Sequence, residues 1–354
     1  MRPSRRTPVP QSGEEPGTEE NATYGAAWSP PNPNHCRIII GNISSFPNHD
    51  NKVKQGEIRD ILTESNVFMF NEHNRTRISS TQLRSVLPSS YGKNSYQCEN
   101  IESPRGEIYM PGGTGIVLDS GLRNYIHKSG GDSRKMGRWT WYTLRGRHDK
   151  VTTIVSIYKC AQGFASYWNQ LSHIRHLSTL EDSTVDPRID PIDMWFEDLS
   201  ELIENSSSEG AVIVAGDFNE NLHDQSGRVQ TLMRRLGLRD CFASYSPLPK
   251  HTWDRGSNRR IDGAFSTIPI RASYSGFDRS PSDHMWMSLE VSISDLLGFQ
   301  HINFPSPPKK RVTSKNILVQ EKYNHLLQKQ VEIHKLKERR KDLEDMMLMD
   351  TIFF

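Results

Sequence analysis

The stretch AVIVAGDFNE, residues 211–220, decides how the rest of the chain is interpreted. Its first five residues are small or β-branched, which is typical of a short buried strand. Asp217 and Asn219 follow this run. Because side chains alternate between the two faces of a strand, both are expected to leave the strand end on the same side. A carboxylate beside an amide can hold a water molecule or a metal ion against a substrate oxygen.

The composition is that of a soluble intracellular protein. The 354 residues are 34% hydrophobic with a mean hydropathy of −0.66, a length that allows one large or two ordinary domains. No run of about 18 apolar residues predicts a membrane span, and the N-terminus lacks the apolar segment of a secretory signal. The four cysteines lie far apart without a CxxC pair, so we expect reduced thiols and no zinc site: Cys36, Cys98, Cys160 and Cys241.

Charge is distributed unevenly along the chain. The net charge is +2, but residues 298–354 alone hold 11 Lys and Arg against 7 Asp and Glu. The rest of the chain is therefore close to neutral. Any affinity of that part for nucleic acid has to come from a local basic patch.

Changes in composition divide the chain into four parts. Residues 1–35 are rich in Pro, Ser, Glu and Asn without apolar periodicity, so we expect them to be disordered. Residues 36–297 are expected to fold as one domain. Residues 298–315 form a Pro- and Lys-rich linker, and residues 316–354 predict a charged helix.

The charged helix leaves two interpretations open. Five apolar residues follow steps of 7, 3 and 4 residues, as in a thin coiled-coil seam: Leu326, Ile333, Leu336, Leu343 and Met347. Lys329 and Arg340 interrupt this seam. The helix is therefore either a lone solvated helix or a site of self-association. The runs PPKKR and KERRK are either part of a solvated surface or basic patches with a function. Such patches would bind the phosphate backbone of nucleic acid or serve nuclear import, and the second of these would give a nuclear location.

Strands and helices alternate in the first part of the domain, and strands dominate later. The pattern predicts an α/β fold of mixed sheets faced by helices. Expected strands are 37–40, 67–70, 139–146, 151–158, 211–215, 259–266, 270–277 and 285–293; expected helices are 52–64, 77–88, an interrupted stretch over 163–206, and 226–238. GGTGIVLDSG, residues 112–121, predicts a tight turn leading into a strand, because no Lys-Ser/Thr follows as in a phosphate loop.

Polar residues recur where the predicted strands end, which is where ligand sites of α/β folds lie. They are Asn42, Glu72, Tyr158, Asp217, Asn219, Asp262, Asp283 and His284. Alone, each has an ordinary explanation: a turn residue, a core tyrosine or a solvated loop residue. Asp262 is the exception, because it interrupts an apolar strand and a buried carboxylate needs a partner. His284 is the natural candidate for the partner of Asp262.

Together these residues are suited to the metal-assisted hydrolysis of a phosphate ester. Mg²⁺ prefers oxygen ligands, which Glu72 and Asp283 supply with help from Asn42. Negative charge that develops on an attacked phosphate needs hydrogen-bond donors.

His284, Asn219 and Tyr158 are donors of that kind, and Asp217 is suited to deprotonate a water molecule. An Asp262–His284 pair favours the imidazolium form of the histidine.

The ordered set IIIGN, FNE, SIY, GDFN, RRIDGAF and SDH resembles the endonuclease/exonuclease/phosphatase superfamily over about residues 36–295. It is similar to DNase I and the apurinic/apyrimidinic endonucleases, which have a four-layer α/β sandwich. The resemblance implies that Glu72 and Asp283 bind Mg²⁺ or Mn²⁺, with Asn42 at the metal site. It also implies that Asp217 and Asn219 act on the nucleophile and phosphate, that Tyr158 contacts phosphate, and that Asp262 orients His284.

Within this superfamily the chain looks most like the endonucleases of non-LTR retrotransposons. The shared segments are GGTGI at 112, GRWTW at 137 and HTW at 251, which makes Thr252 a phosphate or DNA contact. Apurinic/apyrimidinic endonucleases usually have Asp two residues after the first Asn, and Ser44 at that place argues against abasic-site repair.

The resemblance implies an Mg²⁺-dependent DNA endonuclease that leaves a 3′ hydroxyl and a 5′ phosphate. Two alternatives stay open. One is a phosphatase or deadenylase, since HTWDRGSNRR resembles a W-x-D-R stretch of inositol polyphosphate phosphatases in an otherwise different context. The other is a non-catalytic fragment that binds nucleic acid. No polymerase domain fits in the tail, so a truncated or stand-alone endonuclease module is expected.

Overall fold

The structure is a computed structural model. It describes residues 24–26, 32, 34–48, 50–91, 95–102, 108–180, 183–256 and 258–298, together with the single positions 325, 328, 329 and 332. The chain divides into two units, Met1–Asn303 and Phe304–Phe354. The four single positions are helical. The rest of the predicted charged helix with its apolar seam, nearly all of the linker and most of residues 1–35 lie outside the described residues.

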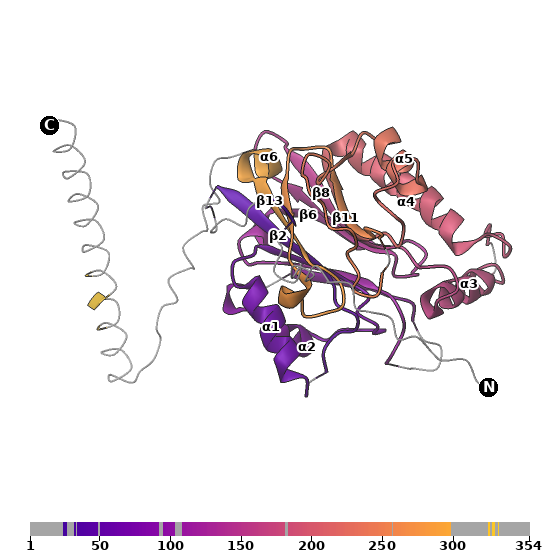
Figure 1. The fold of residues 1–354 in the computed structure, drawn as a ribbon, viewed down its shortest axis with the longest axis horizontal. Helices are drawn as coiled ribbons and strands as arrows, with labels where there is room; N and C mark the ends of the chain where they lie inside the picture. Colours follow the sequence, from indigo (N-terminus) through magenta and orange to yellow (C-terminus); the bar gives the residue numbers. More distant parts are fainter. Residues whose placement is uncertain are drawn as a thin grey trace, which may run out of the picture. The chain divides into compact units, whose positions relative to one another are not determined.

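Two mixed β-sheets form the centre of the first unit (Figure 1). The seven strands of sheet 1 are, in spatial order, β1 (Tyr24–Gly25), β12 (Arg271–Tyr274), β13 (Met287–Ser292), β2 (His35–Asn42), β3 (Val67–Asn71), β5 (Thr114–Leu118) and β4 (Ser95–Glu99). The six strands of sheet 2 are β10 (Arg239–Asp240), β11 (Asp262–Ser266), β9 (Ala211–Asp217), β8 (Val151–Tyr158), β7 (Trp139–Arg145) and β6 (Ile126–Gly131). The pairs β2–β3 and β8–β9 are parallel, and the other neighbours are antiparallel.

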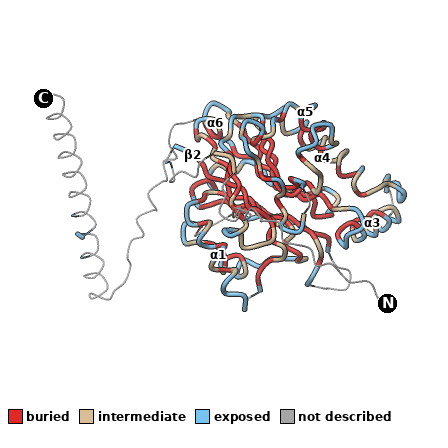
Figure 2. Tube along the Cα trace, in the orientation of Figure 1, coloured by how far each residue is buried: buried red, intermediate tan, exposed pale blue. Residues whose placement is uncertain are grey.

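The central strands are apolar along their whole length because both of their faces are buried. In β2, Ile38 and Ile40 enter the core between the sheets, and Ile39 faces a second core outside sheet 1. In β9, Ile213 enters the core between the sheets, and Val212 faces a third core outside sheet 2. Side chains on the two faces of each central strand therefore pack into different cores, which holds the four layers together. Figure 2 shows that the buried residues concentrate along these strands.

Helices form the outer layers. The helices are α1 (Lys52–Leu62) and α2 (Ser80–Val86) beside sheet 1, α3 (Ala165–Leu177), α4 (Pro191–Glu209) and α5 (Arg228–Arg235) on the side of sheet 2, and α6 (Ile293–Leu297). Their starts follow from the sequence: Ser79 and Gln82 form a capping box for α2, and Asp190 caps α4 ahead of Pro191. The predicted four-layer α/β sandwich is confirmed. Within the described part of the chain, no helix is long and apolar enough to cross a bilayer.

Some short elements differ from the predictions. Tyr24–Gly25 pairs with β12, although residues 1–35 were expected to be disordered; at these two positions backbone pairing along a strand edge provides order that composition does not reveal. The expected strand 285–293 is shorter, because Ser292 caps α6 and residues 293–297 turn into a helix. All four cysteines are free thiols, as predicted.

Candidate active site

Sheet 1 contributes the first half of the site. Asn42 is the last residue of β2 and pairs with Asn71 at the end of β3. Glu72 follows directly and takes a left-handed φ of 53°. Its N–H donates to the Gly113 carbonyl at 2.7 Å, and its carbonyl accepts from Ser45 N–H at 2.8 Å. The backbone of Glu72 is therefore fixed on both sides, which directs its carboxylate to the strand end.

Sheet 2 contributes the second half in one row across three strands. Asp217 on β9 lies opposite Tyr158 on β8 and opposite Asp262 on β11. Asn219 also lies beside Asp217, but not through strand alternation as expected. The strand ends at Asp217, and Asn219 has a left-handed φ of 47°. Its N–H donates to Asp217 Oδ1 at 2.9 Å and its Nδ2 to Lys159 O at 2.7 Å, so Asn219 anchors the turn that holds Asp217.

Asn42 links the two halves. Its Nδ2 donates to Glu72 Oε2 at 2.8 Å and to Asp217 Oδ2 at 3.0 Å. Its Oδ1 accepts from Ser44 N–H at 2.9 Å. This orientation makes Asn42 a donor that holds two carboxylates together, whereas the sequence suggested an oxygen ligand for the metal.

His284 and Asp262 form the predicted pair. Nδ1 of His284 lies 2.9 Å from Asp262 Oδ2, and the two residues are only 5% and 1% exposed. Burial alone would lower the pKa of His284, but the Asp262 carboxylate outweighs it and raises that pKa to about 10. His284 therefore carries a proton on both nitrogens at neutral pH, which makes it a hydrogen-bond donor with positive charge.

The carboxyl groups of Asp217 and Glu72 have pKa values above their usual range. Burial, followed by the charge of Asp262, raises the pKa of Asp217 to about 8. Burial also raises the pKa of Glu72, although the hydrogen bond from Asn42 opposes this. Two carboxylates forced together out of water favour a cation between them.

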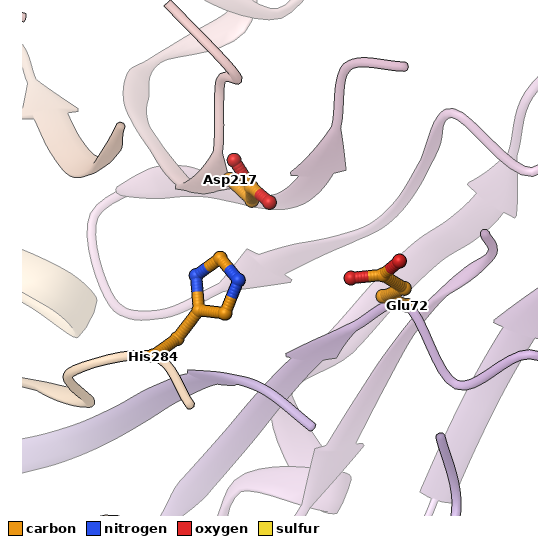
Figure 3. Close-up of side chains that lie close together, drawn as sticks. All are labelled: Glu72, Asp217 and His284. Atoms are coloured by element: carbon orange, nitrogen blue, oxygen red, sulfur yellow. The ribbon is translucent and has the colours of Figure 1, made fainter. Parts of the chain in front are cut away.

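Ligand atoms of Glu72, Asp217 and His284 all lie within 4.8 Å of one another. Figure 3 shows these three side chains around a common space, with Asp217 at the end of β9, Glu72 just after β3 and His284 on the loop ahead of β13. Since His284 is protonated, the two carboxylates are the oxygen donors. Their chemistry fits a hard divalent cation, which is commonly bound through one or two carboxylates, waters and substrate phosphate.

Asp283 has a different environment from the one the sequence suggested. Its carboxylate accepts hydrogen bonds from the Ser44 hydroxyl and, at 3.0 Å, from Trp253 Nε1. Burial alone would raise the pKa of Asp283, but these two hydrogen bonds help to hold it below the usual value. Asp283 faces the same pocket, so its role as a metal ligand stays a prediction. Asp217 is the carboxylate whose ligand atom groups with those of Glu72 and His284 within 4.8 Å.

The structure contradicts the predicted contact of Thr252 with phosphate or DNA. Thr252 is fully buried, and its Oγ1 accepts from the N–H groups of Ile261 and Asp262 at 3.0 and 3.1 Å. Its carbonyl accepts from Met285 N–H at 2.8 Å. Thr252 therefore ties the segment of Asp262 to the segment of His284.

These groups surround one pocket of about 310 Å³. Of the predicted site residues, Glu72, Tyr158, Asp217, Asn219, Asp283 and His284 line it. Tyr158 is nearly buried, with its hydroxyl 3.1 Å from Ser166 Oγ. Sequence reasoning assigned no site role to other lining residues: Ser44, Asn74, Tyr109, Phe164, Ser166 and Trp253. Of these, only Ser44 and Trp253 could have been suspected from the sequence, because Ser44 lies two residues after Asn42 and Trp253 directly follows Thr252.

Several solved structures are similar to this chain at low sequence identity. A solved endonuclease/exonuclease/phosphatase family protein from Leptotrichia buccalis is 14% identical over 72% of this chain and 99% of its own, with a TM-score of 0.48. The endonuclease domain of TRAS1, a telomere-specific non-LTR retrotransposon, is 14% identical over 72% of this chain and 98% of its own, with a TM-score of 0.44. The human Nocturnin catalytic domain is 13% identical over 76% of this chain and 96% of its own, with a TM-score of 0.48.

No curated protein matches the chain. The sequence profile of the Endonuclease/Exonuclease/phosphatase family matches residues 42–284. This match covers more than half of the chain and runs from Asn42 to His284, the two ends of the site described above. The chain therefore belongs to the endonuclease/exonuclease/phosphatase family, whose members are hydrolases of phosphodiester bonds that typically depend on a divalent metal.

Proposed function

We propose that the chain is an Mg²⁺-dependent DNA endonuclease of the retrotransposon type, which nicks DNA to leave a 3′ hydroxyl and a 5′ phosphate. The observation that carries this proposal is the meeting of Glu72, Asp217 and His284 within 4.8 Å at one pocket. The retrotransposon assignment rests on the segments GGTGI at 112, GRWTW at 137 and HTW at 251.

The residues divide the chemistry between them. Glu72, with Asp217 beside it, would hold the divalent cation, which supplies positive charge against the phosphate oxygens. With a cation bound, which would favour the ionised form of Asp217, its carboxylate can accept the proton of the attacking water, and Asn42 and Asn219 keep that carboxylate in place. His284 donates to the phosphate as an imidazolium held by Asp262. General-base catalysis of this kind contributes about 10²–10⁴-fold in rate.

A plasmid-nicking assay with Mg²⁺ or Mn²⁺ tests this function. Wild-type protein is expected to convert supercoiled plasmid to open circles, whereas Asp217→Ala and His284→Ala are expected to lose at least about 10²-fold in rate. Glu201→Ala, an exposed carboxylate on α4, is the matched control and should nick normally. Equal nicking by all four proteins would refute the proposal. Release of phosphate from inositol polyphosphates, or digestion of poly(A), without nicking would favour the phosphatase or deadenylase alternative.

The basic tail provides a second prediction. Residues 298–354 carry 11 Lys and Arg, and we propose that they add affinity for the DNA backbone and direct the protein to the nucleus. Deletion of residues 306–354 should leave cleavage intact and weaken DNA binding at low salt, where unscreened charges act most strongly. Binding isotherms at several salt concentrations measure this. Unchanged affinity and an unchanged salt slope would exclude the tail from DNA binding.

A further inference from the structure

Two exposed aromatic side chains line the pocket of the candidate active site. Among the described residues, the large apolar side chains that stay mostly in solvent include Tyr109 and Phe164, each 59% exposed. Both line the pocket that holds Glu72, Asp217 and His284. Ile108, next to Tyr109 in the chain, and Trp168, one helical turn after Phe164, are similarly exposed. Exposed aromatic side chains at a pocket are candidates for contact with a ligand.

The backbone under these two aromatic residues is well anchored. Tyr109 forms an isolated β-bridge with Arg75, and the residues on either side of it bond to Thr76 and Asn74. Phe164 caps the start of α3: its N–H donates to Ala161 O, and its carbonyl accepts from Trp168 N–H, both at 3.2 Å. Rings on a fixed backbone lose little entropy when a ligand stacks on them.

The same pocket is also lined by Asp283, His284 and Trp253, and the loop of Trp253 continues into the exposed Arg255 and Arg259. A bound strand can therefore meet charged groups suited to phosphates and aromatic rings suited to bases in one pocket. Aromatic rings bind nucleobases without sequence preference, because every base has a π face.

The pocket is small for a ligand site. Its volume of about 310 Å³ lies at the small end of ligand sites, which span roughly 300–1,000 Å³. A base inside an intact duplex is stacked between its neighbours and cannot present its face to Tyr109 or Phe164. It has to leave the stack first, which is least costly for an unpaired base.

On the basis of the proposed function, we infer that Tyr109 and Phe164 form a stacking subsite for an unpaired nucleobase next to the scissile phosphate. The enzyme should therefore prefer DNA with an unpaired nucleotide, or with easily unstacked pyrimidine–purine steps, over a rigid duplex.

Binding without metal tests this inference apart from catalysis. The probes are a DNA duplex with one unpaired 2-aminopurine and the same duplex fully paired, both titrated in EDTA. Wild-type protein is expected to bind the bulged duplex roughly 10- to 100-fold more tightly, the range that base–aromatic stacking supports. Phe164→Ala and Tyr109→Ala should lose most of this preference while binding the paired duplex as before. Phe164→Trp should restore it.

Leu180→Ala is the matched control, because Leu180 is 49% exposed and does not line the pocket. It should behave like the wild type, and thermal unfolding should show that all variants are folded. The inference would be overturned if Tyr109→Ala and Phe164→Ala kept the preference for the bulge or lost affinity for both duplexes equally. It would also be overturned if an RNA duplex with the same bulge bound more tightly than the DNA and this binding depended on Tyr109 and Phe164.

The binding result separates this inference from the proposed function. A preference for the bulge that depends on Tyr109 and Phe164 in a protein that does not nick plasmid would refute the nuclease and leave the subsite standing. Nicking by a protein that shows no such preference would refute the subsite alone.

Discussion

At the scale of single residues, the chemistry of His284 depends on one neighbour. The Asp262 carboxylate, 2.9 Å away, raises the pKa of His284 to about 10 against the effect of burial. Asp262→Asn removes that charge and leaves the burial, so the pKa of His284 should fall well below about 10, with only the more weakly acting Asp217 and Glu72 left to raise it. An NMR titration of His284 in metal-free protein measures this. Turnover at neutral pH should fall by about 10²–10⁴-fold.

The pair also makes stability depend on pH. The pKa of His284 is higher in the folded protein than in the unfolded chain. The contribution of the charged pair to folding stability is therefore fully present below about pH 6.5 and is lost as the pH rises through about 10. Asp262→Asn should abolish this part of the alkaline loss of stability. Asp278→Asn, on an exposed turn, is the control and should leave the titration of His284 unchanged. A wild-type His284 that titrates near 6.5 would contradict the assigned pair.

Which residues meet at the site was predictable from the sequence, but how they are oriented was not. Asp217 and Asp262 could be located because polar residues interrupt apolar strands there. The burial of Thr252, and the hydrogen bonds from Ser44 and Trp253 to Asp283, could not be foreseen. They depend on loops from distant parts of the chain lying against one another, and no local pattern encodes that contact.

At the scale of elements, the turn between β6 and β7 is organised by a buried ion pair. Arg138 is fully buried and donates to Asp132 through Nε at 2.6 Å and through a second nitrogen at 2.7 Å. The same guanidinium reaches Asp198 on α4 at 2.7 Å. Asp132 also accepts from the N–H groups of Arg134 and Met136 inside the turn. The pair therefore shapes the turn and ties it to a helix.

Removal of one partner should be costly. Asp132→Asn leaves the Arg138 charge buried with weaker compensation, so the free energy of unfolding should fall by about 3–5 kcal/mol. Urea unfolding at neutral pH measures this, with the exposed Asp186→Asn as the control. Burial alone would raise the pKa of Asp132, but Arg138 outweighs it and holds the pKa below the usual range. The stabilisation is therefore present above about pH 4 and is lost as the pH falls through that lowered pKa. An Asn variant as stable as the control would contradict this role.

Elements that the sequence did not predict lie mostly at the edges of the sheets. β4 and β6 are edge strands with largely half-exposed or exposed residues, SYQCE and IHKSGG. A strand with one neighbour and little buried surface has no apolar alternation to reveal it. The central strands β2, β3, β8 and β9 were predicted because both of their faces are buried.

At the scale of the whole molecule, the site is split between two sheets that have to stay aligned. Glu72 belongs to sheet 1 and Asp217 to sheet 2. The apolar core between the sheets is not directional, so the alignment has to come from polar contacts across it. Asn71, fully buried at the end of β3, provides one of these contacts: its Nδ2 donates to the Ile157 carbonyl of β8 at 2.6 Å. This bond joins the two sheets next to Glu72, which follows Asn71, and to the end of β8 beside Asp217.

Loss of this contact should reduce turnover more than substrate binding. Asn71→Ala leaves the Ile157 carbonyl without its donor, which costs about 1–3 kcal/mol of stability. It also loosens the position of Glu72 relative to Asp217, and a misplacement of about 1 Å can lower the rate by about 10²-fold. We therefore expect kcat to fall at least about tenfold with little change in KM. Asn66→Ala is the matched control: Asn66 lies just before the opposite end of β3 and bonds to Asp119, just after β5, and to Arg37 N–H on β2, so neither bond reaches sheet 2. That variant should lose similar stability but keep its kcat. If both variants lose stability and both keep kcat, the alignment of the sheets does not depend on Asn71.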